Sequence, residues 1–267
     1  MKKLLPFIFI SFIFLSCNTD EYSPNQIFNR NSPTDVNAKQ IALIHQKTAK
    51  NNIRIAFSGD TQRNYAKAKA FVDNVNARND IDFVILNGDI SDFGLLAEFD
   101  YIYDIYAQLK VPFVCVVGNH DLVANGKDIY KRMFGPLNFT FTFGSVKFIC
   151  HDTNGREYNF DGTTPNINWL RNNLKLDNGT TSLIAISHVP PTDDDFDPTL
   201  SQPYQTLFNQ TPNLISSLHS HNHSKLTTYY QNGNSGVPFM VTNAIVNNAY
   251  TLIDISNGQI NAQEVIF

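Results

Sequence analysis

The stretch FVILNGDISD, residues 83–92, joins an apolar run to a polar turn that carries Asp89. A short apolar run that ends at a glycine is typical of a strand buried on both faces. The stretch FVCVVGNHD, residues 113–121, has the same build and brings Asn119 and His120 to the same point. Two buried strands that each end in polar, metal-binding residue types predict an α/β sheet with a binding site at one edge.

Three other apolar runs end in the same way. In chain order they lead into Asp60 and Gln62, into His188, and into His221 and His223. Because open α/β sheets bind ligands at the carboxyl ends of their strands, we expect all these ends to converge. A carboxylate can hold one cation on each oxygen, so Asp89 is the expected shared ligand of two metal ions. His221 and His223 are two residues apart and are expected on one side of a strand.

The first half of the chain alternates strands with helices. Apolar residues recur at helical spacing over 65–77 and again over 95–109, where Pro112 follows the helix. The order strand, helix, strand, helix, strand is the pattern of parallel strands joined by right-handed crossovers.

The second half is richer in β-structure. Residues 139–149 predict an antiparallel hairpin, and residues 226–267 contain short β-rich runs divided by Asn-Gly turns. A short helix is expected over 165–174. The acidic run 193–197 is expected to be a solvated loop, with a place beside the substrate mouth as the alternative. The predicted fold class is α/β: a single domain of two facing mixed β-sheets flanked by helices, a four-layer αββα sandwich.

The composition is that of a globular chain. Of the 267 residues 42% are apolar, which is enough for one full hydrophobic core. The formal net charge is -4 and only 16% of residues are charged, so a nucleic-acid partner is not expected. Cys115 and Cys150 lie in apolar runs and are expected to be buried thiols, although the sequence leaves a disulfide between them open.

The N-terminus has the features of a processing signal. Lys2 and Lys3 precede an apolar segment, residues 4–15, that is too short to span a bilayer comfortably. The run that ends at Cys17 resembles the lipobox of bacterial lipoproteins, in which the cysteine becomes the acylated N-terminus. An ordinary secretory signal and a buried strand are the alternatives.

These features divide the chain into three expected parts: a lipoprotein signal peptide over 1–16, a lipid-anchored polar tether over 17–45, and a folded domain over 46–267. The mature protein would then be anchored in the cell envelope outside the cytoplasm, in the periplasm or on the outer-membrane surface. Its expected partner is the membrane, through the anchor, and we expect a monomer.

The donor atoms at the five strand ends are carboxylate and amide oxygens and imidazole nitrogens, with no thiolate. This set suits two divalent ions of Mn, Fe, Zn or Ni and argues against a cysteine-rich structural zinc site. Two such ions about 3.5–4 Å apart can hold a hydroxide between them and clamp a phosphoryl group for in-line attack.

Five motifs resemble those of the calcineurin-like metallophosphoesterases in order and spacing. They are DTQ at residues 60–62, GDISD at 88–92, GNHD at 118–121, SH at 187–188 and SHNH at 220–223. The resemblance covers about residues 53–224. It implies a hydrolase of phosphate mono- or diesters with a dinuclear metal centre and a metal-bridging hydroxide nucleophile. Carried over residue by residue, it assigns the first ion to Asp60, Gln62, Asp89 and His223, and the second to Asp89, Asn119, His188 and His221.

The resemblance also implies catalytic roles beside the ligands. His120 would bind or protonate the leaving oxygen and Asp92 would orient it, and a histidine held by a carboxylate is a suitable general acid. Two positions depart from the family pattern. Gln62 stands where the family usually has histidine and is a weaker, uncharged ligand. Ser220 stands where the family usually has glycine.

A different class of function also fits the sequence: a non-catalytic surface lipoprotein that keeps the phosphoesterase fold but binds a ligand or partner. Gln62 is the one feature that favours this alternative. Three further polar residues near the motifs, His151, Asp152 and His219, are expected to support the structure rather than to bind metal.

Overall fold

The computed structural model describes residues 23, 25–48, 52–230 and 236–267. The expected signal peptide and Cys17 therefore lie outside the described residues. Within the described ranges no helix has both the length and the apolar content that crossing a bilayer requires.

The first sheet is built mainly from the front half of the chain. Its strand order is β11-β10-β1-β2-β3, with the bounds β1 Asn52–Ser58, β2 Phe83–Asn87, β3 Phe113–Val116, β10 Ala249–Ser256 and β11 Gln259–Ile266. Strands β1, β2 and β3 pair in parallel, while β10 pairs antiparallel with β1 and β11 with β10. The parallel part is the strand–helix repeat that the sequence predicted, and the C-terminal hairpin extends it.

The second sheet holds the remaining strands in the order β4-β5-β6-β7-β9-β8. Their bounds are β4 Phe139–Phe143, β5 Val146–Cys150, β6 Ser182–Ile186, β7 Leu214–His219, β8 Leu226–Tyr229 and β9 Pro238–Val241. Strands β5, β6, β7 and β9 are parallel, and β4 and β8 close the two edges antiparallel. Both sheets are therefore mixed.

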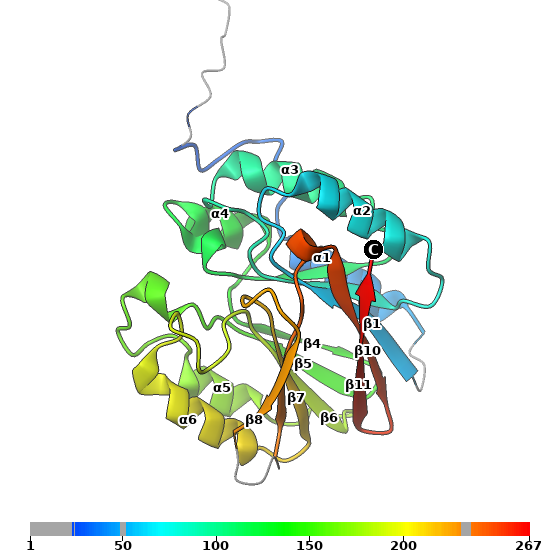
Figure 1. The fold of residues 1–267 in the computed structure, drawn as a ribbon, viewed down its shortest axis with the longest axis vertical. Helices are drawn as coiled ribbons and strands as arrows, with labels where there is room; N and C mark the ends of the chain where they lie inside the picture. The colour runs from blue at the N-terminus through cyan, green and yellow to red at the C-terminus, as the bar shows by residue number, and fades with distance from the viewer. Residues whose placement is uncertain (1–22, 24, 49–51, 231–235) are drawn as a thin grey trace, which may run out of the picture.

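Helices cover the outer face of each sheet, as Figure 1 shows. The first sheet carries α2 Tyr65–Asn76, α3 Leu96–Tyr106 and α4 Gly126–Met133, and the second carries α5 Ile167–Asn173 and α6 Pro198–Asn209. The described residues also contain three short 3-10 turns: η1 His120–Leu122, η2 Gly155–Tyr158 and η3 Ile245–Asn247.

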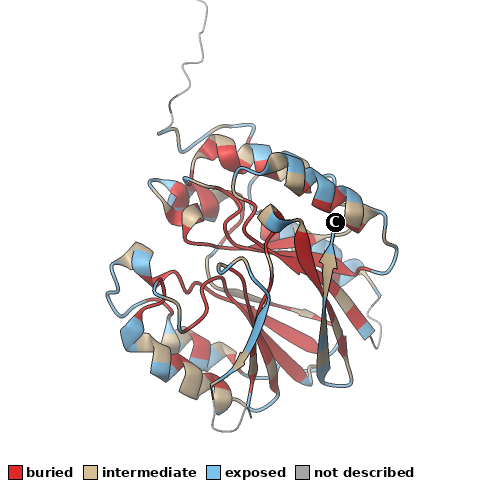
Figure 2. Cartoon of the chain, in the orientation of Figure 1, coloured by how far each residue is buried: buried red, intermediate tan, exposed pale blue. Residues whose placement is uncertain are grey.

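Three apolar cores separate the four layers, and the buried residues of Figure 2 follow them. Between the sheets Phe83 is fully buried, and its ring contacts those of Phe141, Phe143 and Phe148 at 5.5–5.8 Å between centroids. Face-to-face packing of two sheets with helices outside is the αββα sandwich that the sequence predicted.

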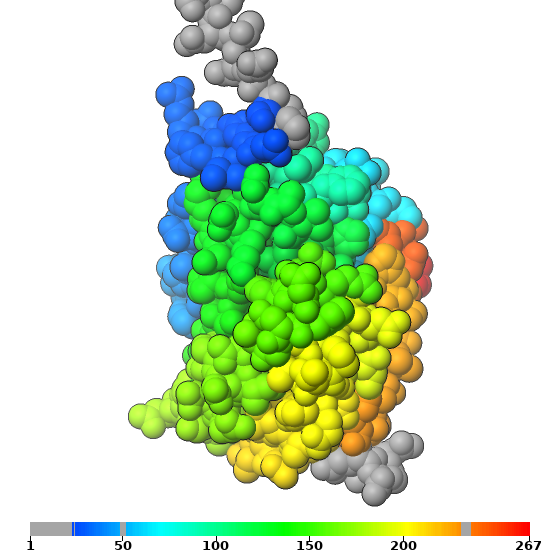
Figure 3. Space-filling model, turned by 90° about the vertical axis from the view of Figure 1, so that its left-hand side faces the viewer, coloured from blue at the N-terminus to red at the C-terminus, as the bar shows by residue number. Residues whose placement is uncertain are grey.

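Helix α1 Val36–Gln46 lies within the segment expected to be a polar tether over 17–45, but the structure makes it part of the folded domain. Val36 and Ile44 are buried in two different cores. The Asn37 side chain donates to the Cys115 carbonyl and accepts from the Cys115 amide, both at 2.8 Å, and so completes the hydrogen bonding of β3. The segment before it lies against the surface of α4 (Figure 3), where the Arg132 guanidinium covers the Phe28 ring at 5.0 Å.

The loop between β6 and β7 differs from the expectation. It contains α6, whose start the sequence does mark: Asp197 caps the Thr199 amide and Pro198 is the first helical residue. The acidic run before it is not a solvated loop, because Asp195 and Asp197 are 4% and 1% exposed. Phe196 is buried between them and holds the run against α6.

Candidate metal centre

The carboxyl ends of β1, β2, β3, β6 and β7 meet at one edge of the sandwich. Asp60, Asp89 and Asn119 follow the three strands of the first sheet, and His188 and His221 follow two strands of the second. The candidate centre therefore lies between the sheets and draws side chains from both. This is the convergence that the sequence predicted.

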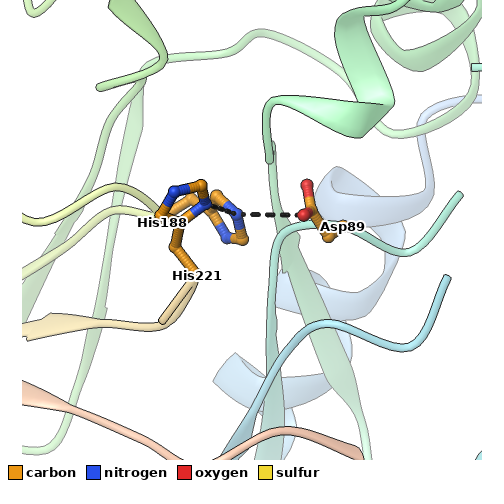
Figure 4. A group of neighbouring side chains, drawn as sticks. All are labelled: Asp89, His188 and His221. Carbon is orange, nitrogen blue, oxygen red and sulfur yellow. Dashed lines mark hydrogen bonds and ion pairs between the residues drawn. The ribbon is translucent and has the colours of Figure 1, made fainter. Parts of the chain in front are cut away.

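Asp89 faces His188 and His221 across the gap between the two sheets (Figure 4). One carboxylate oxygen, Oδ2, is 3.3 Å from His188 Nε2, and the other, Oδ1, accepts a hydrogen bond of 3.0 Å from the His120 amide. Burial would raise the pKa of Asp89, but the attraction of His188 and His120 outweighs it and holds that pKa below its ordinary value. The carboxylate is thus ionised and faces the second sheet.

His188 is fixed by its other ring nitrogen. Nδ1 donates to the Asn87 carbonyl at 2.8 Å, so Nε2 points at Asp89 and lies 3.8 Å from Asp60 Oδ1. Burial would lower the pKa of His188, yet the charge of Asp89 raises it to about 10. A cation between these groups would replace this proton, since either one neutralises the charge of the buried carboxylates.

Asp60 offers one oxygen to the backbone and leaves the other unsatisfied. Oδ2 accepts from the His221 amide at 3.1 Å. Oδ1 is buried and has no hydrogen-bond partner among the described residues, although His223 Nε2 lies 3.2 Å away. An unsatisfied buried carboxylate oxygen is costly unless a cation or donor reaches it. The oxygen and the imidazole nitrogen beside it are suited to share one cation.

His221 completes a second set of donors. Its Nδ1 lies 3.2 Å from Asn119 Oδ1 and 3.3 Å from His188 Nε2. Ligand atoms of Asp89, His188 and His221 all lie within 4.8 Å of one another, and Figure 4 shows the three side chains pointing at one another. Amide, imidazole and carboxylate donors in this grouping suit a first-row divalent ion.

The turns that carry these residues are held in unusual backbone conformations. Asp60, Gln62, Asp89, His221 and His223 all have positive φ, between 49° and 72°. Such residues cluster at functional sites, where surrounding contacts impose the strain. The two histidines were expected on one side of a strand, and that was wrong: β7 ends at His219, and both lie in the turn beyond it.

The glycines of the two central motifs allow the turns to approach one another. A Cβ added at Gly88 would lie 2.4 Å from His188 Nδ1, and one at Gly118 would lie 2.2 Å from the Asp89 amide nitrogen. Neither position has room for a side chain. Because glycine has no Cβ, the turns after β2, β3 and β6 can lie close enough for their metal-binding side chains to converge.

Gln62 is held through its backbone. Its amide donates to the Asp89 carbonyl at 2.8 Å, which joins the first and second motif turns. The side chain is half-buried beside the site. Its role as a metal ligand stays a prediction.

His120 lies at the open side of the centre, 36% exposed. Its Nδ1 is 2.8 Å from the Asp92 carbonyl oxygen and 3.5 Å from the Asp92 carboxylate, while its Nε2 lies 4.0 Å from Asp89 Oδ2. Burial lowers the pKa of His120, but Asp89 and the bond to Asp92 raise it above its ordinary value. Asp92 is in turn bonded by Arg63 Nε at 2.9 Å. The ring is therefore oriented with Nε2 free toward the site.

Two supporting residues were not predicted. Asp121 accepts hydrogen bonds from the Ser91 amide at 2.8 Å and the Gly118 amide at 2.9 Å, and so ties the two central turns together. Burial and the charge of Asp89 raise the pKa of Asp121 to about 7. Asp193 accepts from His221 Nε2 at 3.1 Å, a contact that lowers the pKa of Asp193 well below its usual range. The only sequence signal for Asp193 was its place in the loop after His188.

Ser220 fits the position where glycine was expected. Its hydroxyl donates to the Asn87 carbonyl and lies 2.9 Å from His188 Nδ1, while the Asn87 side chain donates to it at 3.0 Å. The hydroxyl therefore joins the groups that hold His188 in place and removes no ligand. His151 and His219 are buried and bond hydroxyl groups, His151 that of Tyr204 and His219 those of Ser187 and Ser217. Their structural role stays a prediction.

Comparison with known proteins identifies the family to which this chain belongs. A sequence profile described as calcineurin-like phosphoesterase matches residues 53–225, more than half of the chain. The chain belongs to the calcineurin-like phosphoesterase family. Family membership makes it a hydrolase of phosphoester bonds that depends on divalent metal ions. No curated protein sequence matches the chain.

Solved structures share the calcineurin-like fold at low sequence identity. A purple acid phosphatase from yellow lupin is 13% identical, with a TM-score of 0.58 over 81% of this chain and 52% of the lupin chain. A protein from Thermus thermophilus, TT1561, is 12% identical, with a TM-score of 0.54 over 81% of this chain and 99% of its own. The calcineurin-like phosphoesterase YfkN from Bacillus subtilis is 13% identical, with a TM-score of 0.51 over 80% of this chain and 90% of its own. The present chain thus spans about half of the lupin phosphatase.

The donor groups fit the metal ions that the calcineurin-like family implies. Oδ1 of Asp60 is buried and accepts no hydrogen bond from the described residues, so a cation beside it would satisfy it. The Nδ1 bond of His188 leaves its Nε2 directed at two carboxylates, which is the arrangement of a metal-ligating histidine held by a second partner. Both observations concern side-chain atoms and are independent of the motif match.

Proposed function

We propose that this calcineurin-like phosphoesterase hydrolyses phosphate mono- or diesters with two divalent ions bound at the centre described above. The observation that carries the proposal is the gathering of carboxylate and imidazole donors from both sheets at one point. His188 Nε2 lies 3.3 Å from Asp89 and 3.8 Å from Asp60, and the ligand atoms of Asp89, His188 and His221 lie within 4.8 Å of one another. His223 Nε2 lies 3.2 Å from Asp60. The expected ligands are Asp60, Gln62, Asp89 and His223 for the first ion, and Asp89, Asn119, His188 and His221 for the second.

When bound, the two ions would hold a hydroxide between them as the nucleophile and would neutralise charge on the phosphoryl oxygens. His120 serves the leaving group. With Nδ1 bonded to the Asp92 carbonyl, the protonated ring carries its second proton on Nε2, which faces the site. As the bond from phosphorus to the leaving oxygen breaks, that proton passes to the oxygen, and the product alcohol departs neutral. Asp92 keeps the ring in this orientation.

Assay of the purified domain tests the proposal. The protein is loaded with Mn²⁺ or Zn²⁺, its metal content is measured, and its turnover of an aryl phosphodiester and an aryl phosphomonoester is followed. About two ions per chain and metal-dependent release of the phenol are expected. A panel of nucleotides, sugar phosphates and phospholipids then identifies the substrate class. Loading with two ions but no turnover of any ester would contradict the proposal.

The alternative function is a non-catalytic surface lipoprotein, and Gln62 is the residue that favours it. An uncharged amide at the first ion's position weakens one of the two sites. This alternative expects one bound ion or none and no turnover, so the same metal analysis separates the two functions.

We also propose the cellular setting that the N-terminal sequence indicates. Cys17 would carry the lipid, the part of the expected tether that precedes α1 would link it to the domain, and the monomeric enzyme would act on small phosphoesters outside the cytoplasm in the cell envelope. Metabolic labelling with a palmitate analogue tests the anchor, because Cys17→Ser should abolish the label. Fractionation of cells then tests the location.

A further inference from the structure

His221 is held at both of its ring nitrogens, and the two contacts differ in kind. Nδ1 faces the candidate metal centre, 3.2 Å from Asn119 Oδ1 and 3.3 Å from His188 Nε2. Nε2 faces away from it and lies 3.1 Å from Asp193 Oδ1. A neutral imidazole carries one proton, so a carboxylate that accepts from Nε2 leaves the lone pair of Nδ1 free for a cation.

Asp193 is itself firmly placed. Its Oδ1 accepts from the Asp195 amide at 3.0 Å, its Oδ2 accepts from the Asn222 side chain at 2.7 Å, and its own amide donates to the Pro190 carbonyl at 3.1 Å. Asp195 is buried and paired with Arg156. The carboxylate is therefore held from the β6–α6 loop and from the turn that carries His221.

We propose that Asp193 is a positioning residue of the metal centre: it fixes the orientation and tautomer of His221 so that Nδ1 is presented to the second ion. The inference rests on the proposed function only in requiring a cation at that centre. Carboxylates that accept from the far nitrogen of a ligating histidine orient the ring and raise its basicity. The acidic run after His188 thus becomes part of the support of the site.

The competing interpretation is that Asp193, Asp195 and His221 bind a cation of their own, since their ligand atoms lie within 4.8 Å of one another. The contacts argue against it. Asp195 is already neutralised by Arg156, and every oxygen of Asp193 accepts a hydrogen bond. A third ion in the metal analysis would overturn the positioning role.

Metal titration of three variants tests the inference. Asp193→Ala removes the acceptor, Asp193→Asn keeps an oxygen that can accept from Nε2, and Asp194→Ala is the control because Asp194 is exposed in the same loop. Chelated protein is titrated with Zn²⁺ by calorimetry. We expect Asp193→Ala to weaken one ion about 10–100-fold with the stoichiometry at saturation unchanged. Asp193→Asn should recover part of the loss and Asp194→Ala should bind like the wild type.

Equal zinc affinities of Asp193→Ala and the wild type would overturn the inference. So would the complete loss of one ion from Asp193→Ala, because that is the behaviour of a direct ligand. Circular dichroism of the metal-free variants shows whether they remain folded. If Asp193→Ala does not fold, the Asp193→Asn titration decides the matter, and a zinc affinity of Asp193→Asn equal to that of the wild type would then overturn the inference.

Nitrogen-15 NMR of the histidine rings gives a readout that a merely structural role would not move. In metal-free wild-type protein at mildly alkaline pH we expect His221 to carry its proton on Nε2. In Asp193→Ala both tautomers should be populated, and an unchanged Nε2–H tautomer would overturn the inference. A protein that shows these effects but hydrolyses no phosphoester would refute the proposed function and leave the role of Asp193 standing.

Discussion

Single residues decide how the two proposed ions would be held at this site. Asp89 is the only described carboxylate that contacts both His188 and His120: Oδ2 faces the two imidazole rings and Oδ1 accepts from the His120 amide. Asp121 lies behind it and binds only amides and a hydroxyl. The two aspartates of neighbouring motifs thus have different tasks, and their hydrogen-bond partners distinguish them.

Asp89→Asn should abolish measurable turnover, by at least about a thousandfold, because removing the charge costs several kcal/mol of cation and transition-state binding. Metal content should fall while circular dichroism stays like that of the wild type. The measurements are turnover of an aryl phosphodiester and metal analysis of the purified variant. Asp194→Asn, an exposed change of the same kind, is the control and should match the wild type. Near-normal turnover by Asp89→Asn would remove the basis of the proposed mechanism.

His120→Ala should lower kcat about 10²–10⁴-fold, since a general acid contributes that much. Its metal content should not change, because His120 lies outside the donor group of Asp89, His188 and His221. The loss should be smaller for an ester with an acidic phenol, which departs without a proton, than for an alkyl ester. Steady-state kinetics with both esters measures this, and loss of bound metal would instead make His120 a ligand.

At the scale of elements, α6 supports the second sheet behind the site. Tyr204 of α6 is buried and bonds His151, which follows β5, at 2.9 Å. Burial lowers the pKa of His151 to about 4. The folded protein therefore holds this imidazole neutral at a pH where the unfolded chain would protonate it.

This burial predicts acid sensitivity. Between the ordinary histidine pKa of 6.5 and the folded value of about 4, only the unfolded chain binds the proton. The free energy of unfolding should therefore be unaffected by His151 above pH 6.5 and fall by up to about 3 kcal/mol as the pH is lowered to 4. Urea unfolding at several pH values measures the slope. In His151→Gln, which keeps an amide for Tyr204, the slope should be shallower, and equal slopes would contradict the prediction.

The elements also show what the sequence could and could not reveal. Apolar runs that end in Gly-Asp or Gly-Asn located β2 and β3 and their ligands because burial and turn chemistry are both local. Helix α6 was not predicted, since Pro203 and several polar residues interrupt its pattern. The left-handed backbone at His221 and His223 was not predicted, because this turn is held by contacts with Asp60, which is distant in sequence.

On the scale of the whole molecule, the centre joins the two sheets. Asp60, Asp89 and Asn119 come from one sheet, and His188, His221 and His223 from the other. The four-layer fold was predictable from the order of strands and helices. The relative position of the layers was not, because it depends on ring packing such as that of Phe83 on Phe148. The candidate metal centre therefore depends on the packing of the two sheets, since only their correct stacking brings the donor side chains together.

Metal removal should therefore loosen the contact between the sheets and lower the stability of the whole domain. An ion present at a hundredfold excess over its Kd stabilises the folded state by about 2.7 kcal/mol, which for a domain of this size is a rise in Tm of about 5–10 °C. Scanning calorimetry of the chelated and the Zn²⁺-loaded protein measures the difference. Asp89→Asn should show little or no rise, because it lacks the shared carboxylate. A wild-type Tm that does not respond to zinc would mean that the ions do not bind across the two sheets, and the centre described here would not be where they act.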